Sequence, residues 1–157
     1  MRIGFGFDVH PLEEGRELRL GGITIPHSKG AKGHSDADVL IHAICDALLG
    51  AANLGDIGKH FPDTSAEYKN IDSCILLKKV MEMVRQGKYA LENIDVTLCL
   101  EKPKIASHVD AIKKSLSNVM GVEINCISIK ATTNEKLGYI GREEGVACYA
   151  VVLLKNV

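Results

Sequence analysis

Residues 33–50 read Gly33-His34-Ser35-Asp36-Ala37-Asp38-Val39-Leu40-Ile41-His42-Ala43-Ile44-Cys45-Asp46-Ala47-Leu48-Leu49-Gly50, and this stretch carries the start and stop signals of one helix. Ser35 or Asp36 can cap a helix that runs to about Leu49. Gly50 is expected to end it, because glycine tolerates the left-handed conformation that follows many helices. Most of the helix circumference is apolar, which predicts that the helix is buried.

One polar stripe interrupts the apolar surface of this helix. Asp38, His42 and Asp46 recur every four residues, so their side chains lie on the same side. Carboxylates and an imidazole that face inward are costly unless they are paired or bind a metal ion. Two interpretations of His42 are therefore open: a hydrogen-bonded core histidine, which is the commoner case, or a metal ligand.

Composition limits the class of protein. A chain of 157 residues with 46% hydrophobic and 25% charged residues is typical of one globular domain. The net charge of −1 gives no field that would attract nucleic acid or an acidic membrane surface, and no apolar run reaches the length of a membrane span. Five scattered cysteines without a C-x-x-C pair, and a strand-like start without a targeting segment, predict a reducing, cytoplasmic location.

Alternation and helical spacing predict further elements on both sides of the central helix. Strands are expected over residues 2–10, 89–100, 127–131 and 146–154, a hairpin over 18–25, and helices over 71–86 and 107–120. Ser107 and Asp110 resemble a capping box for the last helix. The run 146–154 is apolar throughout, as in a strand buried on both faces. We expect a single α+β domain over residues 1–157, with helices on one face of a mixed sheet.

Asp8 and His10 lie one strand period apart, so both point to the same face of the first strand, where two glycines let another group come close. His42 would add a third ligand if its helix packs on that face. One carboxylate and two imidazoles suit zinc, and three protein ligands leave a coordination position for water or a substrate oxygen. Asp46, one helical turn after His42, is expected to hydrogen-bond its ring and fix the tautomer.

A second polar cluster, Lys130-Ala131-Thr132-Thr133-Asn134-Glu135-Lys136-Leu137-Gly138, follows a predicted strand. Its backbone N–H and hydroxyl groups could cradle phosphate oxygens while Glu135 holds a magnesium ion that bridges them. A polar surface turn is the open alternative. Glu101-Lys102-Pro103-Lys104 is a weaker version of the same pattern.

Taken together, these residues resemble the 2-C-methyl-D-erythritol 2,4-cyclodiphosphate synthase family of the non-mevalonate isoprenoid pathway. The resemblance covers the whole chain. Its motifs are RIGFGFDVH (2–10), HSDADV (34–39), DALLGA (46–51), LGDIG (54–58), FPDT (61–64), KATTNE (130–135) and GREEG (141–145). It implies a zinc ion on Asp8, His10 and His42, and Mg²⁺ or Mn²⁺ at Glu135 with a diphosphate.

The activity that the resemblance implies is that of a cyclising phosphorus–oxygen lyase. It converts 4-diphosphocytidyl-2-C-methyl-D-erythritol 2-phosphate to 2-C-methyl-D-erythritol 2,4-cyclodiphosphate and releases CMP. His34 and Thr133 match positions that orient phosphate oxygens, and Asp38 and Asp46 would support the metal ligands. Substrate contacts are implied for Ser35, Asp56, Ile57, Gly58, Phe61, Pro62, Asp63, Thr64, Ser65, Leu100, Lys104, Ile105, Ala106, Ala131, Thr132, Thr133, Tyr139 and Arg142.

The resemblance also implies a homotrimer with active sites between subunits. A cavity on its threefold axis, lined by Phe7, Tyr139 and Arg142, can hold an isoprenoid diphosphate. Phe5 stands where many relatives have histidine, on the strand face opposite to the presumed metal ligands, and Tyr149 adds a bulky polar group near that cavity. Two other functions stay open: a metal-dependent phosphoesterase that delivers water, and a non-catalytic trimeric binder of isoprenoid diphosphates.

Overall fold

Helix α1 (Val39–Ala51) lies at the centre of the structure, a computed structural model that describes all of residues 1–157. Nearly all of its side chains are buried, as the apolar sequence predicts. The side chain of Asp38 caps it by accepting a hydrogen bond from Ile41 N–H, so the predicted cap at Ser35 or Asp36 is wrong. Gly50 lies inside the helix, which ends one residue later, so the predicted stop is also wrong.

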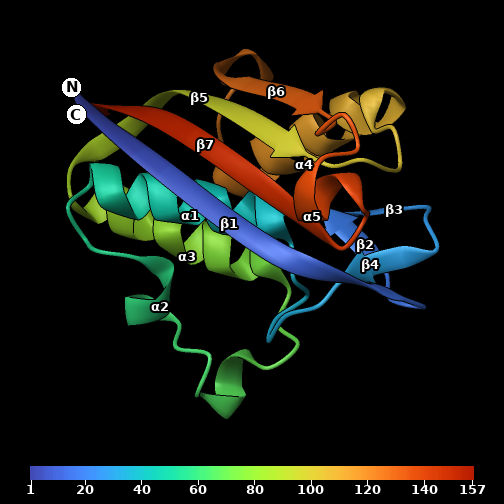
Figure 1. Ribbon diagram of the computed structural model, residues 1–157. Helices are drawn as coiled ribbons and strands as arrows, with labels where there is room; N and C mark the ends of the chain where they lie inside the picture. The colour runs from blue at the N-terminus through green and yellow to red at the C-terminus, as the bar shows by residue number, and fades with distance from the viewer.

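A five-stranded mixed sheet covers one side of α1 (Figure 1). Its order is β4 (Lys29–Ala31), β1 (Arg2–Glu14), β7 (Gly145–Asn156), β5 (Tyr89–Cys99) and β6 (Ile127–Thr132). Only β5 and β6 run parallel, and the other neighbours are antiparallel. Because Arg2 at the start of β1 pairs with Leu154 near the end of β7, the two chain termini lie side by side. The expected α+β fold with a mixed sheet is confirmed.

The two other long helices pack on the same face of the sheet as α1 (Figure 1). They are α3 (Ser73–Gln86), capped by Asp72, and α4 (Val109–Met120), which ends at Gly121 in the left-handed conformation. No side-chain cap precedes α4, so the predicted capping box of Ser107 and Asp110 is wrong. The short elements are the β2 (Leu18–Leu20) and β3 (Ile23–Ile25) hairpin, α2 (Ile57–His60), α5 (Gly138–Gly141), η1 (Ala66–Tyr68), η2 (Ala106–His108) and η3 (Ile124–Cys126).

Two glycines of β1 bring α1 unusually close to the sheet. A Cβ atom added at Gly4 would lie 1.9 Å from the carbonyl oxygen of Ala47, and one added at Gly6 would lie 1.9 Å from that of Ala43. These distances leave no room for any side chain, so the helix backbone packs directly on the strand. This contact places His42 of α1 over the next residues of β1.

The opposite face of β1 and β7 carries exposed apolar side chains. Phe5 is 62% exposed and Val151 is 44% exposed, and the ring of Tyr149 lies 5.0 Å from that of Phe7. The prediction that residues 146–154 are buried on both faces is therefore wrong for the single chain, because the helices cover only one face of β7. No helix of the chain combines the length and apolar composition that crossing a membrane requires.

Candidate active site

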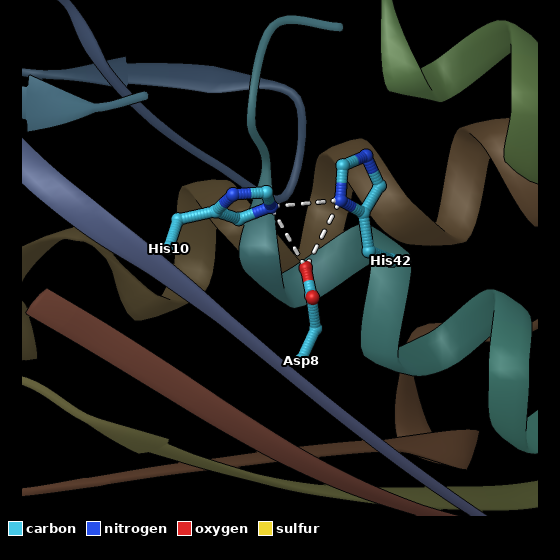
Figure 2. A group of neighbouring side chains, drawn as sticks. All are labelled: Asp8, His10 and His42. Carbon is cyan, nitrogen blue, oxygen red and sulfur yellow. Dashed lines mark hydrogen bonds and ion pairs between the residues drawn. The ribbon is translucent and has the colours of Figure 1, made fainter. Parts of the chain in front are cut away.

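Three side chains from β1 and α1 converge beside the contact just described (Figure 2). Asp8 Oδ2 lies 2.9 Å from His10 Nε2 and 3.0 Å from His42 Nδ1, and the two nitrogens are 3.1 Å apart. All three residues are partly buried. The structure thus brings together the carboxylate and the two imidazoles that strand parity and helix position predict.

The hydrogen-bond partner of His10 Nδ1 shows that the other ring nitrogen, Nε2, has a free lone pair that faces Asp8 and His42. His10 Nδ1 lies 3.0 Å from the carbonyl oxygen of Lys32, which can only accept, so Nδ1 carries the hydrogen and donates it. The neutral ring then presents an unprotonated Nε2 to the site. On His42 the nitrogen that faces away from the triad, Nε2, lies 2.9 Å from Ser73 Oγ and 3.1 Å from Ser35 Oγ.

The donor set and its spacing fit a zinc ion. Zinc prefers nitrogen and carboxylate ligands at about 2.0–2.1 Å in a tetrahedron, which places donor atoms about 3.3 Å apart. The three observed separations of 2.9 to 3.1 Å are close to that value. Without a cation, an anionic oxygen and imidazole lone pairs repel at this distance, and a metal ion or a proton between them would relieve the repulsion.

A cavity of about 340 Å³ opens beside the triad. It is lined by His10, His34, Ser35, His42, Ile57, Gly58, Phe61, Asp63, Tyr68, Ile71 and Leu76. The sequence pointed to the first eight of these residues but not to the last three. Of the other expected contacts in this region, Asp56 caps α2, and the backbone oxygen of Ser65 accepts a hydrogen bond from His34 Nε2.

A second, separate cavity of about 230 Å³ lies at the ends of β5 and β6. It is lined by Leu100, Glu101, Pro103, Lys104, Ile105, Ala106, Ala131, Thr132 and Thr133. The Glu101 carboxylate accepts a hydrogen bond from Asn134 N–H at 3.2 Å and so ties the two lining loops together. The two cavities share no lining residue, and Glu135 is not among the metal-binding candidates around Asp8.

The model of the YgbB family matches residues 1–155. The chain belongs to the YgbB family. A protein of Bacteroides fragilis named 2-C-methyl-D-erythritol 2,4-cyclodiphosphate synthase is 60% identical over all of this chain and 99% of its own length. A Chlorobaculum tepidum protein of the same name is 57% identical over 99% of both chains.

Solved structures agree with this membership of the YgbB family. A 2C-methyl-D-erythritol-2,4-cyclodiphosphate synthase in a CDP-bound form superposes with a TM-score of 0.91 at 41% identity, over 98% of this chain and 100% of that one. The bifunctional IspDF of Campylobacter jejuni gives a TM-score of 0.96 at 44% identity. That match covers 99% of the present chain but only 42% of the longer bifunctional protein.

Two residues that are expected to support the proposed metal ligands, Asp38 and Asp46, have other partners. Asp46 accepts a hydrogen bond from Ile57 N–H at 2.8 Å and not from His42, so it holds the start of α2. Asp38, wholly buried, accepts hydrogen bonds from Gly21 and Gly22 N–H as well as capping α1. The expected bond from Asp46 to His42 is therefore wrong. Ser73, which no sequence pattern singled out, contacts His42 in that place.

Of the expected axial residues, Phe7 and Tyr139 lie away from the triad. Phe7 is on the exposed apolar face of β1, and Tyr139 of α5 packs near Gly145 at the start of β7. Arg142 is exposed, and its guanidinium donates two hydrogen bonds of 2.9 Å to the Glu144 carboxylate.

The triad is electrostatically coupled. Burial alone would raise the pKa of Asp8, but hydrogen bonds with His10 and His42 outweigh it and lower the pKa from 3.8 to about 2. Burial alone would lower the pKa of His42, but the hydrogen bond with Asp8 and the charges of three carboxylates raise it above 6.5. In the metal-free protein His42 therefore keeps its proton to a higher pH than a free histidine.

Zinc affinity is therefore expected to decline on acidification from a pH above 6.5. A raised pKa means that more of His42 is protonated at any given pH, and a protonated nitrogen cannot bind a metal ion. Each pH unit below the pKa should weaken binding about tenfold for that single ligand. Competition with a chelator of known affinity across the pH range measures this. An affinity that stays constant to pH values well below that of a free histidine would contradict it.

Proposed function

We propose that this chain catalyses an intramolecular phosphoryl transfer, converting 4-diphosphocytidyl-2-C-methyl-D-erythritol 2-phosphate to 2-C-methyl-D-erythritol 2,4-cyclodiphosphate with release of CMP. The observation that carries the proposal is the convergence of Asp8, His10 and His42 within about 3 Å beside a cavity. Membership of the YgbB family and full-length relatives named as synthases of this product support it. The chain would be one synthase domain over residues 1–157.

The proposed metal ions are zinc on Asp8, His10 and His42, and Mg²⁺ or Mn²⁺ at Glu135. When bound, such ions act as Lewis acids that withdraw charge from phosphate oxygens. The protein itself would mainly position the substrate, because both reacting phosphates are anionic. His34, at the cavity wall, and Thr133, in the second cavity, would donate hydrogen bonds to phosphate oxygens.

The reaction balances without a protein base. An oxygen of the 2-phosphate forms a bond to the β-phosphorus of the diphosphate, and the bond from that phosphorus to the bridging oxygen breaks. CMP leaves with the bridging oxygen as a phosphate oxygen. Because the attacking phosphate is already ionised near neutral pH, no side chain has to remove a proton from it.

We propose further that the active form is a homotrimer with each active site between two subunits. The two cavities share no lining residue, which is consistent with the implication of the family resemblance that a neighbouring chain brings Thr132 to Glu135 to the triad. The apolar face of Phe5, Phe7 and Tyr149 would be covered in the same assembly.

Tyr139 and Arg142 would line the axial cavity with Phe7, and an isoprenoid diphosphate there would compete with Glu144 for Arg142. The five cysteines are free, which suits the cytoplasm. We propose in addition the substrate contacts that the family resemblance implies.

A ³¹P NMR time course with the nucleotide substrate tests the proposed reaction. Resonances of CMP and of a cyclic diphosphate should grow together, in equal amounts. An analogue without the 2-phosphate separates the alternatives, because a cyclase has no nucleophile there and should release little CMP. Rapid release of CMP from that analogue would identify a phosphoesterase instead, and no turnover of either compound would favour a binding protein.

A further inference from the structure

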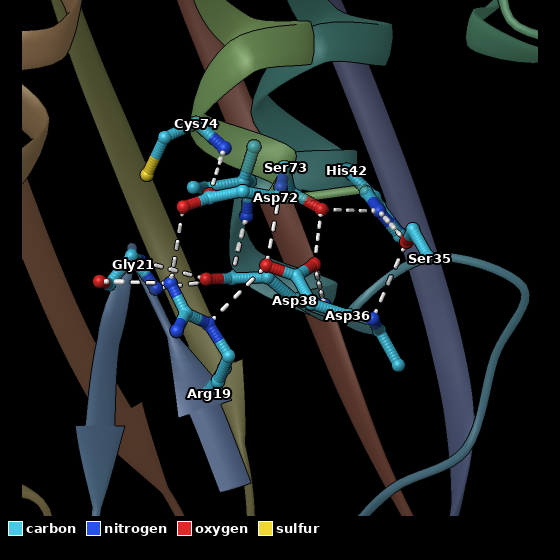
Figure 3. A network of polar contacts seen from close by, with 12 residues as sticks. Arg19, Gly21, Ser35, Asp36, Asp38, His42, Asp72, Ser73 and Cys74 are labelled. Carbon is cyan, nitrogen blue, oxygen red and sulfur yellow. Dashed lines mark hydrogen bonds and ion pairs between the residues drawn. The ribbon is translucent and has the colours of Figure 1, made fainter. Parts of the chain in front are cut away.

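The outward nitrogen of His42 is held by a chain of polar groups that leads away from the cavity (Figure 3). His42 Nε2 lies 2.9 Å from Ser73 Oγ, and Ser73 Oγ lies 2.5 Å from Asp36 Oδ1. Ser73 has no exposed surface, so water does not replace either contact. This inference rests on the metal site proposed above and concerns what prepares His42 for it.

The direction of each hydrogen bond follows from counting hydrogens. Ser73 has one hydroxyl hydrogen, and it donates that hydrogen to the Asp36 carboxylate, which can only accept. Ser73 Oγ must therefore accept from His42, so His42 carries its hydrogen on Nε2. If Ser35 donated to Nε2 instead, the oxygen of Ser73 would face a lone pair at 2.9 Å, which is unfavourable.

Asp36 is fixed in place as the end of this chain. Its carboxylate also accepts hydrogen bonds from Ser73 N–H at 3.1 Å and from Asp38 N–H at 3.3 Å. The guanidinium of Arg19 lies 3.2 Å from its second oxygen and 3.5 Å from Asp72, so it offsets the negative charges of both. An ionised, anchored carboxylate is a strong acceptor and keeps the Ser73 hydrogen directed toward itself.

Two carboxylates thus compete for the hydrogen of His42. Asp8 Oδ2, 3.0 Å from Nδ1, favours the tautomer with hydrogen on Nδ1, whose lone pair is then lost to a metal ion. We propose that Ser73 and Asp36 are positioning residues that hold this hydrogen on Nε2 and so leave the Nδ1 lone pair free to bind a cation. Loss of such supporting hydrogen bonds weakens metal sites by about 10–100-fold.

The test compares Ser73→Ala with Ser117→Ala. Ser117 Oγ donates to the carbonyl oxygen of Val122 in another part of the fold, so this control loses the same hydroxyl without touching His42. Long-range ¹H–¹⁵N NMR of the metal-free proteins, at an alkaline pH where the imidazole is neutral, reports which nitrogen of His42 carries hydrogen. Chelator competition then gives the affinity for zinc alone.

The wild-type and Ser117→Ala proteins should show hydrogen on Nε2 of His42. Ser73→Ala should shift the population toward Nδ1 and weaken zinc binding about 10–100-fold. Asp36→Asn, which keeps Ser73 in place, should shift both quantities in the same direction and serves if Ser73→Ala does not fold. Hydrogen on Nδ1 in the wild type, or weaker zinc binding with an unchanged tautomer, would overturn the inference. If the wild type binds no zinc, the metal proposal fails while the NMR comparison still decides the tautomer.

Discussion

Replacing His42 with alanine is expected to abolish CMP release and to weaken zinc binding by more than about 100-fold, because supporting residues alone are worth about 10–100-fold. The change removes one of three ligand atoms and leaves Asp8 Oδ2 with His10 as its only partner in the triad. The protein should stay folded, since α1 still presents its buried apolar residues to the sheet. Zinc titration, the ³¹P assay and the circular dichroism spectrum measure the three quantities.

His108→Ala is the matched control for this variant. His108 precedes α4 and takes no part in the triad, so its removal should leave zinc affinity and the spectrum unchanged. The His42→Ala protein could, after its metal is removed, still turn over substrate at a rate near that of the wild type. That result would rule out the proposed role of the triad.

The convergence of Asp8, His10 and His42 could be predicted from sequence because it follows from two short periodicities. Strand parity puts Asp8 and His10 on one face, and the apolar circumference of α1 forces His42 to face inward. The glycines of β1 give the third requirement, a close approach of helix and strand. Each of these is a local property that a short stretch of the sequence shows by itself.

The supporting contacts could not be predicted in the same way. Asp46 lies one turn from His42, but the N–H of Ile57 in α2 takes its carboxylate. Ser73 reaches His42 only because α3 packs against α1, and such contacts between distant segments leave no periodic signal. The burial of β7 could not be predicted for a related reason: an apolar run does not show which of its faces another segment covers, and the chain leaves one face of β7 open.

Gly6→Ala is expected to destabilise the protein strongly, and Gly4→Ala to a similar degree. The new Cβ would lie 1.9 Å from Ala43 O and 2.7 Å from Ala47 N, both backbone atoms that cannot rotate away. Inserting a methyl group into a packed core commonly costs about 1–3 kcal/mol, and we expect about 3 kcal/mol or more here. Urea denaturation at a fixed protein concentration measures the free energy of unfolding.

Gly6→Ala should also weaken zinc binding, because α1 can move away from β1 only by taking His42 away from Asp8 and His10. Gly50→Ala is the matched control, because Gly50 lies in α1 and a Cβ atom there meets nothing within 4 Å. Alanine in place of glycine favours a helix by up to about 1 kcal/mol. That variant should be as stable as the wild type or more so, with unchanged zinc affinity. If Gly6→Ala kept both its stability and its zinc affinity, the direct packing of helix on strand would not be what holds the three ligands together.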